Sequence, residues 1–160
     1  MVRTAPRRPA RRPGLTVAGV DLAEAAGVLQ AHDEYEALET RLDYRFRDRG
    51  LLEHALTHKS RSAEDLSGGV ADNESLEFLG DALLGFAIAE ALFRGFPDYD
   101  EGRKSKLKAA LVSTTTLAEQ AERLGLGNCL LLGKGEEQSG GRQKPSLLAD
   151  ACEAVIASVY

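Results

Sequence analysis

The spacing of apolar residues constrains the fold of this chain more than any other feature of its sequence. From about Asp21 onward, apolar residues recur every three or four positions, and few stretches alternate between apolar and polar. This spacing gives an α-helix one apolar face, whereas a half-buried strand requires alternation. The sequence therefore predicts an all-α fold. The expected helices are 21–30, 33–42, 49–57, 73–95, 102–112, 114–124 and 146–160.

Glycine and proline mark the predicted breaks between these helices. The breaks are Gly68-Gly69, Gly95 with Pro97, Gly125-Leu126-Gly127, and a loop from Gly133 to Pro145. A chain of 160 residues is long enough for one domain that buries roughly two-thirds of its unfolded surface. We therefore expect one helical domain over 21–160. The apolar pattern is still running at Tyr160, so this domain is expected to be truncated within its last helix.

The first twenty residues differ in composition from the rest. Five arginines and three prolines, with no acidic residue, fall between Met1 and Gly14. This composition predicts a disordered basic arm over 1–20, which either keeps the protein soluble or attracts RNA. Without these five, fifteen basic residues remain against twenty-five acidic ones. Phosphate neutralisation normally supplies much of the affinity for nucleic acids, so either the domain does not bind them or its acids hold metal ions.

Several classes of protein are disfavoured by composition. No apolar run reaches the roughly 20 residues of a membrane helix, and the N-terminus lacks an apolar signal region. The two cysteines, Cys129 and Cys152, provide neither a disulfide framework nor the paired spacing of a zinc site. We therefore expect a cytoplasmic protein that does not associate with a membrane.

Three acidic residues share one face of the longest predicted helix. At about 100° per residue, Glu74, Glu77 and Asp81 lie within roughly 60° of one another. Like charges at such spacing destabilise an isolated helix by about 0.2–0.5 kcal/mol per pair. No lysine or arginine between Asn73 and Phe93 offsets them. The cluster is therefore either a solvated face or a site for a cation.

A second acidic pair, Asp150 and Glu153, lies among small and apolar residues in the last helix. A buried carboxylate costs several kcal/mol unless it is protonated, ion-paired or bound to a metal. If the two acidic helices cross, four or five carboxylates converge, and such an all-oxygen site suits Mg²⁺ or Mn²⁺. Gly80 and Gly85 each cost about 1 kcal/mol inside a helix. Both fit positions where another backbone approaches closely.

The nine residues from Asn73 to Asp81 resemble the signature of the ribonuclease III family, usually written N-E-R-L-E-F-L-G-D. Ser75 departs from this pattern, because arginine is usual there, and the departure puts contacts of that arginine in the dimer or the catalytic valley in doubt. Further segments resemble other family motifs in the same order, and together they cover about Leu42 to Tyr160. They are 55–60, 100–102 with 106–109, 132–136 with 139–141, and 148–150 with 153–154.

The resemblance implies a fold, an activity and partners. The fold is the ribonuclease III endonuclease domain, a helical bundle around a buried signature helix, working as a homodimer. The implied activity is metal-dependent cleavage of double-stranded RNA in rRNA and other RNA processing, giving 5′-phosphate and 3′-hydroxyl ends. Mg²⁺ is the implied cofactor, Mn²⁺ is expected to substitute for it, and no small-molecule cofactor is expected. Family members commonly carry a separate double-stranded-RNA-binding domain, which we do not expect within this sequence.

The resemblance also implies roles for particular residues. The metal ligands are Glu77, Asp81, Asp150 and Glu153, and the catalytic residues are Asp81, Glu153 and Glu74. In the family, Glu74 lies at the dimer interface and supports the cleavage site. Glu101 and Glu136 match two acids that line the catalytic valley.

The remaining candidates have ordinary structural explanations. His54 and His58 are expected to cap or pack, and Phe78 and Cys152 to lie in the core. Lys104, Lys106 and Lys108 either touch phosphates or form a solvated face. The alternative functions are a non-catalytic RNA-binding scaffold of the same fold and an all-α interaction domain without RNA.

Overall fold

The computed structural model describes residues 16–17, 20–21 and 33–160. The chain divides into two compact units, Met1–Asp33 and Glu34–Tyr160. In the first unit, strands β1 (Thr16–Val17) and β2 (Val20–Asp21) pair antiparallel. Asp21 therefore ends a strand, where the sequence had predicted the start of a helix. The rest of the predicted basic arm and of the predicted helix 21–30 lies outside the described residues.

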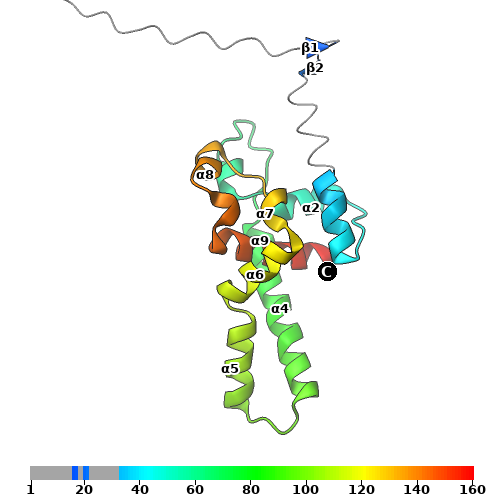
Figure 1. The fold of residues 1–160 in the computed structure, drawn as a ribbon, viewed down its shortest axis with the longest axis vertical. Helices are drawn as coiled ribbons and strands as arrows, with labels where there is room; N and C mark the ends of the chain where they lie inside the picture. The colour runs from blue at the N-terminus through cyan, green and yellow to red at the C-terminus, as the bar shows by residue number, and fades with distance from the viewer. Residues whose placement is uncertain (1–15, 18–19, 22–32) are drawn as a thin grey trace, which may run out of the picture. The chain divides into compact units, whose positions relative to one another are not determined.

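The second unit is helical, which confirms the all-α prediction (Figure 1). Its elements are the helical residues 33–42, α2 (Arg49–Leu56), α3 (Lys59–Ser62), α4 (Glu74–Gly95), α5 (Glu101–Leu111), α6 (Thr114–Leu124), α7 (Leu126–Cys129), α8 (Lys134–Gln138), the 3₁₀ turn η1 (Gly141–Gln143) and α9 (Pro145–Val159). The six long helices predicted within this unit agree with these bounds to within one residue. The short helices α3, α7 and α8 were not predicted, because one turn leaves no periodic pattern to detect.

Side-chain caps explain where several helices begin. Asp48, Asp100 and Ser113 each accept a hydrogen bond from a backbone N–H in the first turn of α2, α5 and α6. These bonds satisfy donors that have no partner inside the helix. Pro145 occupies the first turn of α9, where a missing N–H costs nothing.

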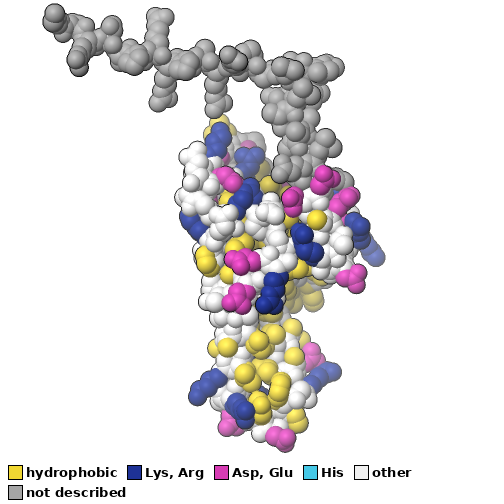
Figure 2. Space-filling view, in the orientation of Figure 1, with side chains coloured by type: hydrophobic (Ala, Val, Ile, Leu, Met, Phe, Trp, Pro, Cys, Tyr) yellow, Lys and Arg dark blue, Asp and Glu magenta, His cyan; other side chains and the backbone are white. Residues whose placement is uncertain are grey.

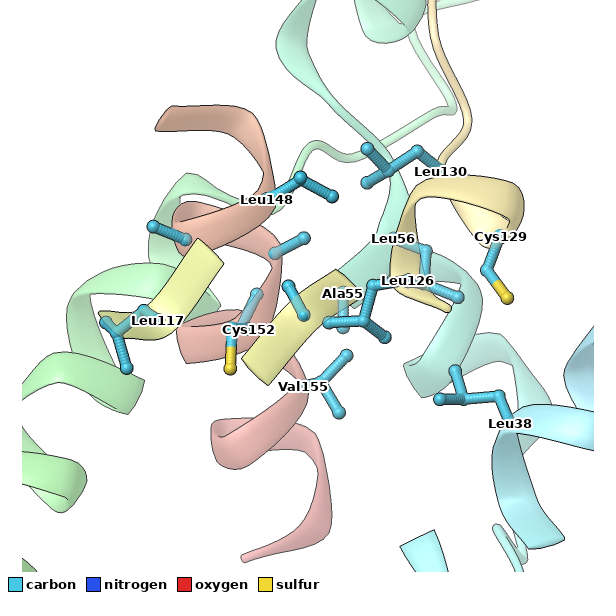
Figure 3. Packing of buried hydrophobic residues seen from close by; sticks show 14 of the residues in the cluster. Leu38, Ala55, Leu56, Leu117, Leu126, Cys129, Leu130, Leu148, Cys152 and Val155 are labelled. Atoms are coloured by element: carbon cyan, nitrogen blue, oxygen red, sulfur yellow. The ribbon is translucent and has the colours of Figure 1, made fainter. Parts of the chain in front are cut away.

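Helix α9 is the centre of the helical unit. It packs against α2, α4 and α6, and over half of its residues are buried. The buried cluster around it includes Leu56, Leu126, Leu148 and Val155 (Figure 3). Cys152 belongs to the same cluster, which confirms its predicted place in the core.

The signature helix α4 is less enclosed than predicted. Its buried residues are Gly80 and Leu92 alone, so α9 is the buried central helix and the expectation for α4 is corrected. The first half of α4 packs on α9, whereas its second half runs beside α5 in a hairpin that extends away from the rest of the unit (Figure 1). Every residue of α5 is at least partly exposed.

Large apolar side chains are exposed along α4. Phe78, Phe86 and Phe93 are 82%, 69% and 72% exposed, and apolar surface gathers over the α4–α5 hairpin (Figure 2). The predicted core position of Phe78 is therefore wrong. Phe78 lies two positions before Gly80, about 200° around the helix, so it points away when Gly80 faces α9. No helix in the described part of the chain has the length and apolar character to cross a membrane.

Candidate metal centre

The site is built where α4 crosses α9, and Gly80 makes that crossing possible. A Cβ at Gly80 would lie 1.8 Å from the carbonyl oxygen of Glu153. No side chain fits in that space, so the predicted close approach of a second backbone is confirmed at Gly80. Gly85 differs, because a Cβ there would meet the flexible end of Lys108 at 3.3 Å.

This crossing brings acidic residues from the two helices together. Glu77, Asp150 and Glu153 each offer a carboxylate oxygen, and these oxygens lie within 4.8 Å of one another. All three side chains are half-buried. Asp81, the fourth predicted ligand, is exposed and lies outside this group of three, but its charge acts on both Glu77 and Glu153.

Burial and mutual repulsion make the cluster electrostatically unfavourable. Burial, followed by the charges of Asp81 and Glu77, raises the pKa of Glu153 to about 7. Burial, followed by the charge of Asp150, also raises the pKa of Glu77. Burial raises the pKa of Asp150, against the opposing effect of His58 and Lys59. The three acids therefore share an environment that disfavours their charged forms.

The donor set fits a hard divalent cation. Three carboxylates supply only oxygen atoms, which Mg²⁺ and Mn²⁺ prefer to nitrogen or sulfur. A divalent charge at this point would favour the ionised acids and so reverse the effect of burial on their pKa values. Asp81 could add a fourth carboxylate from the exposed side of α4.

Glu74 lies beside the cluster rather than in it. It is exposed and forms an ion pair with Lys59, with 3.2 Å between Nζ and Oε1. Its charge raises the pKa of Glu77, so it is close enough to influence the ligand set. Ser75 is exposed, and nothing in the structure explains the serine at this position.

The other two candidate acids occupy different places. Glu136 pairs with Lys144 at 2.5 Å, and this contact lowers the pKa of Glu136. It also lines an open hollow of about 650 Å³ that includes His58 and Lys59. Glu101 starts α5, accepts a hydrogen bond from Ser105 and lines a separate hollow in the hairpin.

Of the two histidines considered above, His58 has the capping role predicted for it. The His58 ring caps α3 by accepting from the backbone N–H of Ser60. The Nε2 atom of His54 lies 2.7 Å from the carbonyl oxygen of Asp72.

The hairpin lysines do not all share one surface. Lys104 lies over the ring of Phe93, with 5.7 Å from Nζ to the ring centroid. Lys108 lies next to Gly85, and Lys106 is exposed. Packing against the hairpin therefore accounts for two of the three.

One supporting residue was not predicted. Asn73 is 3% exposed, its backbone N–H donates to Thr57, and its side-chain amide donates to the carbonyl of Ala55. These bonds fix the start of α4 against the end of α2, and so fix where Glu77 lies. An asparagine at the first residue of a predicted helix was a detectable signal, but it indicates a cap and not a bond between two helices.

Comparison with known proteins identifies the family of this domain. The model of the family described as Ribonuclease-III-like matches residues 48–160. The chain belongs to the ribonuclease III family. Ribonuclease 3 of Syntrophobacter fumaroxidans is 52% identical over 132 residues, 82% of this chain and 54% of that protein. Ribonuclease 3 of Solibacter usitatus is 56% identical over 128 residues, 77% of this chain and 47% of that protein.

Solved structures agree with this assignment. A ribonuclease III nuclease domain from Campylobacter jejuni has a TM-score of 0.71 and 48% identity, covering 78% of this chain and 82% of that one. It is described as structurally flexible in a region involved in dimer formation. This ribonuclease III chain spans about half the length of the two curated relatives, whereas it covers 82% of the nuclease-domain structure.

Proposed function

We propose that this ribonuclease III domain is an endonuclease that cleaves double-stranded RNA with Mg²⁺, or Mn²⁺ in its place. The observation that carries the proposal is the convergence of Glu77, Asp150 and Glu153 at the α4–α9 crossing. Family membership supports the activity, and the all-oxygen donor set supports the choice of metal. The proposed metal ligands are these three residues and Asp81, and the proposed catalytic residues are Asp81, Glu153 and Glu74.

The residues divide the work according to their positions. A bound divalent cation lowers the pKa of water and neutralises a phosphate oxygen. Glu153 and Asp150 lie one turn apart on the buried helix, so they hold their positions with little freedom. Asp81 is exposed, which leaves it open to solvent and RNA. Glu74 keeps Lys59 beside the cluster through their ion pair. Hydrolysis is expected to leave 5′-phosphate and 3′-hydroxyl ends.

The substrate is expected to be recognised by shape. The deep, narrow major groove of an RNA duplex hides its base edges, so binding rests on phosphates and 2′-hydroxyl groups. Little sequence preference follows from this. The expected roles are rRNA and other RNA processing in the cytoplasm, where reducing conditions suit the free Cys129 and Cys152.

We also propose that two copies associate through the exposed face of α4. The rings of Phe78, Phe86 and Phe93 are mostly exposed, and burying such rings would stabilise a dimer. A dimer would place two sites on one duplex, so that each site cuts one strand. The description of the Campylobacter jejuni domain is consistent with association.

Glu153→Gln tests the metal assignment. The change keeps the size of the side chain but removes the charge that would hold the cation, so cleavage is expected to fall by about a thousandfold or more. RNA binding should not weaken, because a carboxylate repels phosphate. Single-turnover cleavage of a short duplex in Mg²⁺, with saturating enzyme, separates the two effects. Chelation of the metal should abolish cleavage by the parent.

Glu74→Gln is the matched comparison and should lose less activity, because Glu74 lies outside the ligand group. Near-parental cleavage by Glu153→Gln would refute the metal assignment. A parent that binds duplex RNA in Mg²⁺ but never cuts it would indicate a non-catalytic scaffold.

A further inference from the structure

Lys59 is the cation placed at the edge of the carboxylate cluster. Its Nζ lies 3.2 Å from Glu74, and its charge acts on both Glu77 and Asp150. Its side chain is 66% exposed, at the rim of the open hollow shared with His58 and Glu136. The sequence motif around Lys59 matched the family, but the proposed cleavage chemistry gives this lysine no task of its own.

The backbone that carries Lys59 is fixed from three sides. The His58 ring caps α3, and the Ser60 hydroxyl accepts from the backbone N–H of Gly133 at 2.9 Å. A Cβ at Gly133 would lie 2.4 Å from the Ser60 carbonyl oxygen, so the backbone directly before α8 lies against α3. The backbone of Thr57 bonds to Asn73. Lys59 can therefore change partners only by moving its side chain.

The pairing with Glu74 is easily exchanged. Both side chains are largely exposed, 66% for Lys59 and 58% for Glu74, and ion pairs of this kind contribute little to stability because water competes for both charges. A phosphate brought to the cluster must pass several acids, and a cation at the entrance would offset their repulsion. An ammonium on a flexible stem suits a phosphate approached from several directions.

We propose that Lys59 leaves Glu74 and binds a backbone phosphate of the RNA at the edge of the carboxylate cluster. This inference rests on the proposed function, since it names a substrate contact of the same site. In this arrangement the ion pair with Glu74 holds Lys59 beside the cluster when RNA is absent. The open hollow leaves room for the RNA strand to contact Lys59. Lys59 then contributes to binding the duplex, whatever its base sequence.

The test measures binding without cleavage. Each variant is made in the Glu153→Gln background, and the dissociation constant of a short duplex RNA in Mg²⁺ is measured over a range of monovalent salt. Lys59→Ala should weaken binding several-fold, and the slope of log affinity against log salt should fall by about one, as for the loss of one phosphate contact. Lys59→Arg should restore both, because it keeps the charge.

Two controls separate a phosphate contact from a structural role. Arg94→Ala removes the cation of another exposed ion pair, the one with Glu90. It should leave the slope of log affinity against log salt unchanged. Glu74→Gln frees Lys59, so it should leave binding equal or tighter. If Glu74→Gln weakened binding as Lys59→Ala does, Lys59 would be only a partner for Glu74. An unchanged slope in Lys59→Ala would also overturn the proposal.

A failure of the proposed function would give a different experimental result from a failure of the Lys59 proposal. A parent chain that does not cleave duplex RNA in Mg²⁺ contradicts the nuclease assignment, yet the salt slopes still report whether Lys59 contacts phosphate. Thermal melting of Lys59→Ala should match that of its background, because the side chain is exposed. A large drop would mean that the loss of binding has a structural cause, and this too would contradict the proposal.

Discussion

The two halves of α4 are built in opposite ways. In the first half, Gly80 contacts the backbone of Glu153 with no space for a Cβ, and Glu77 lies half-buried beside the acids of α9. In the second half, Phe86 and Phe93 are mostly exposed beside the exposed helix α5. The side of the first half that faces α9 is packed around charged groups, whereas the second half, like Phe78 on the opposite side of the first, presents apolar surface to water. The side that faces α9 is completed within the chain, whereas the exposed rings of Phe78, Phe86 and Phe93 form an apolar face that a second copy could cover.

The largest effect is expected at the crossing. Gly80→Val would force α4 and α9 apart, because its side chain would occupy the position of the Glu153 carbonyl. Overpacking of this kind typically costs about 1–3 kcal/mol of stability. Misplacing reacting groups by about 1 Å can cost a hundredfold in rate, so single-turnover cleavage should fall at least that far.

Gly85→Ala is the control for that change. Its new methyl group meets only the end of Lys108, so cleavage should be unchanged, and stability should be equal or higher by up to about 1 kcal/mol. Thermal melting and cleavage of both variants decide the matter. Parental cleavage by Gly80→Val would show that the crossing does not determine the site.

An intermediate effect is expected on the exposed face. Phe78→Asp should leave the melting of the monomer nearly unchanged, since the ring is 82% exposed. If this face joins two copies, the dimer dissociation constant should rise by about tenfold or more, as for an aromatic residue central to an interface. Sedimentation at several concentrations measures this. Leu66→Asp, at a fully exposed leucine outside α4, should not change association.

The smallest effect concerns pH in the absence of metal. The pKa of Glu153 is raised to about 7 in the folded chain from an ordinary value of 4.5. A group with a raised carboxyl pKa binds its proton more tightly when folded, so the folded state loses stability as pH rises from 4.5 through about 7. Above that window the penalty is constant.

Melting with chelator at pH 5 and pH 8 tests this. The parent should lose more stability between the two values than Glu153→Gln, which cannot ionise at this position. Mg²⁺ should reduce the difference, because it stabilises the ionised form. Equal losses in both proteins would mean that Glu153 is not responsible.

The helices and the acidic site were predicted from different features of the sequence. Long helices were detected because apolar residues recur in them every three or four positions, and acids were detected because Asp150 and Glu153 lie among apolar neighbours. The close approach at Gly80 was correctly predicted because a glycine destabilises a helix interior, so its presence there indicates that a side chain would not fit. The same reasoning was wrong for Gly85, whose neighbour is a side chain that can move.

Other features depend on which face a helix presents, and periodicity alone does not decide that for an apolar helix. Helix α4 is apolar around much of its circumference, so Phe78 could not be assigned to the core or the surface from its sequence. The relative burial of α4 and α9 was misjudged for the same reason. The hydrogen bonds of Asn73 to Ala55 and Thr57 link α4 to α2, and only the folded chain brings these residues together.

The central position of α9 has a consequence for the order in which the protein becomes functional during synthesis. During synthesis, a domain generally folds as a unit. Helices α2, α4 and α6 all bury their apolar faces against α9, which emerges last of the helices in this unit. Until residues 145–159 are made, Glu77 has neither of its carboxylate neighbours from α9. The hydrophobic core also lacks its central helix until then. Core formation and assembly of the site are therefore both expected to wait for the synthesis of α9.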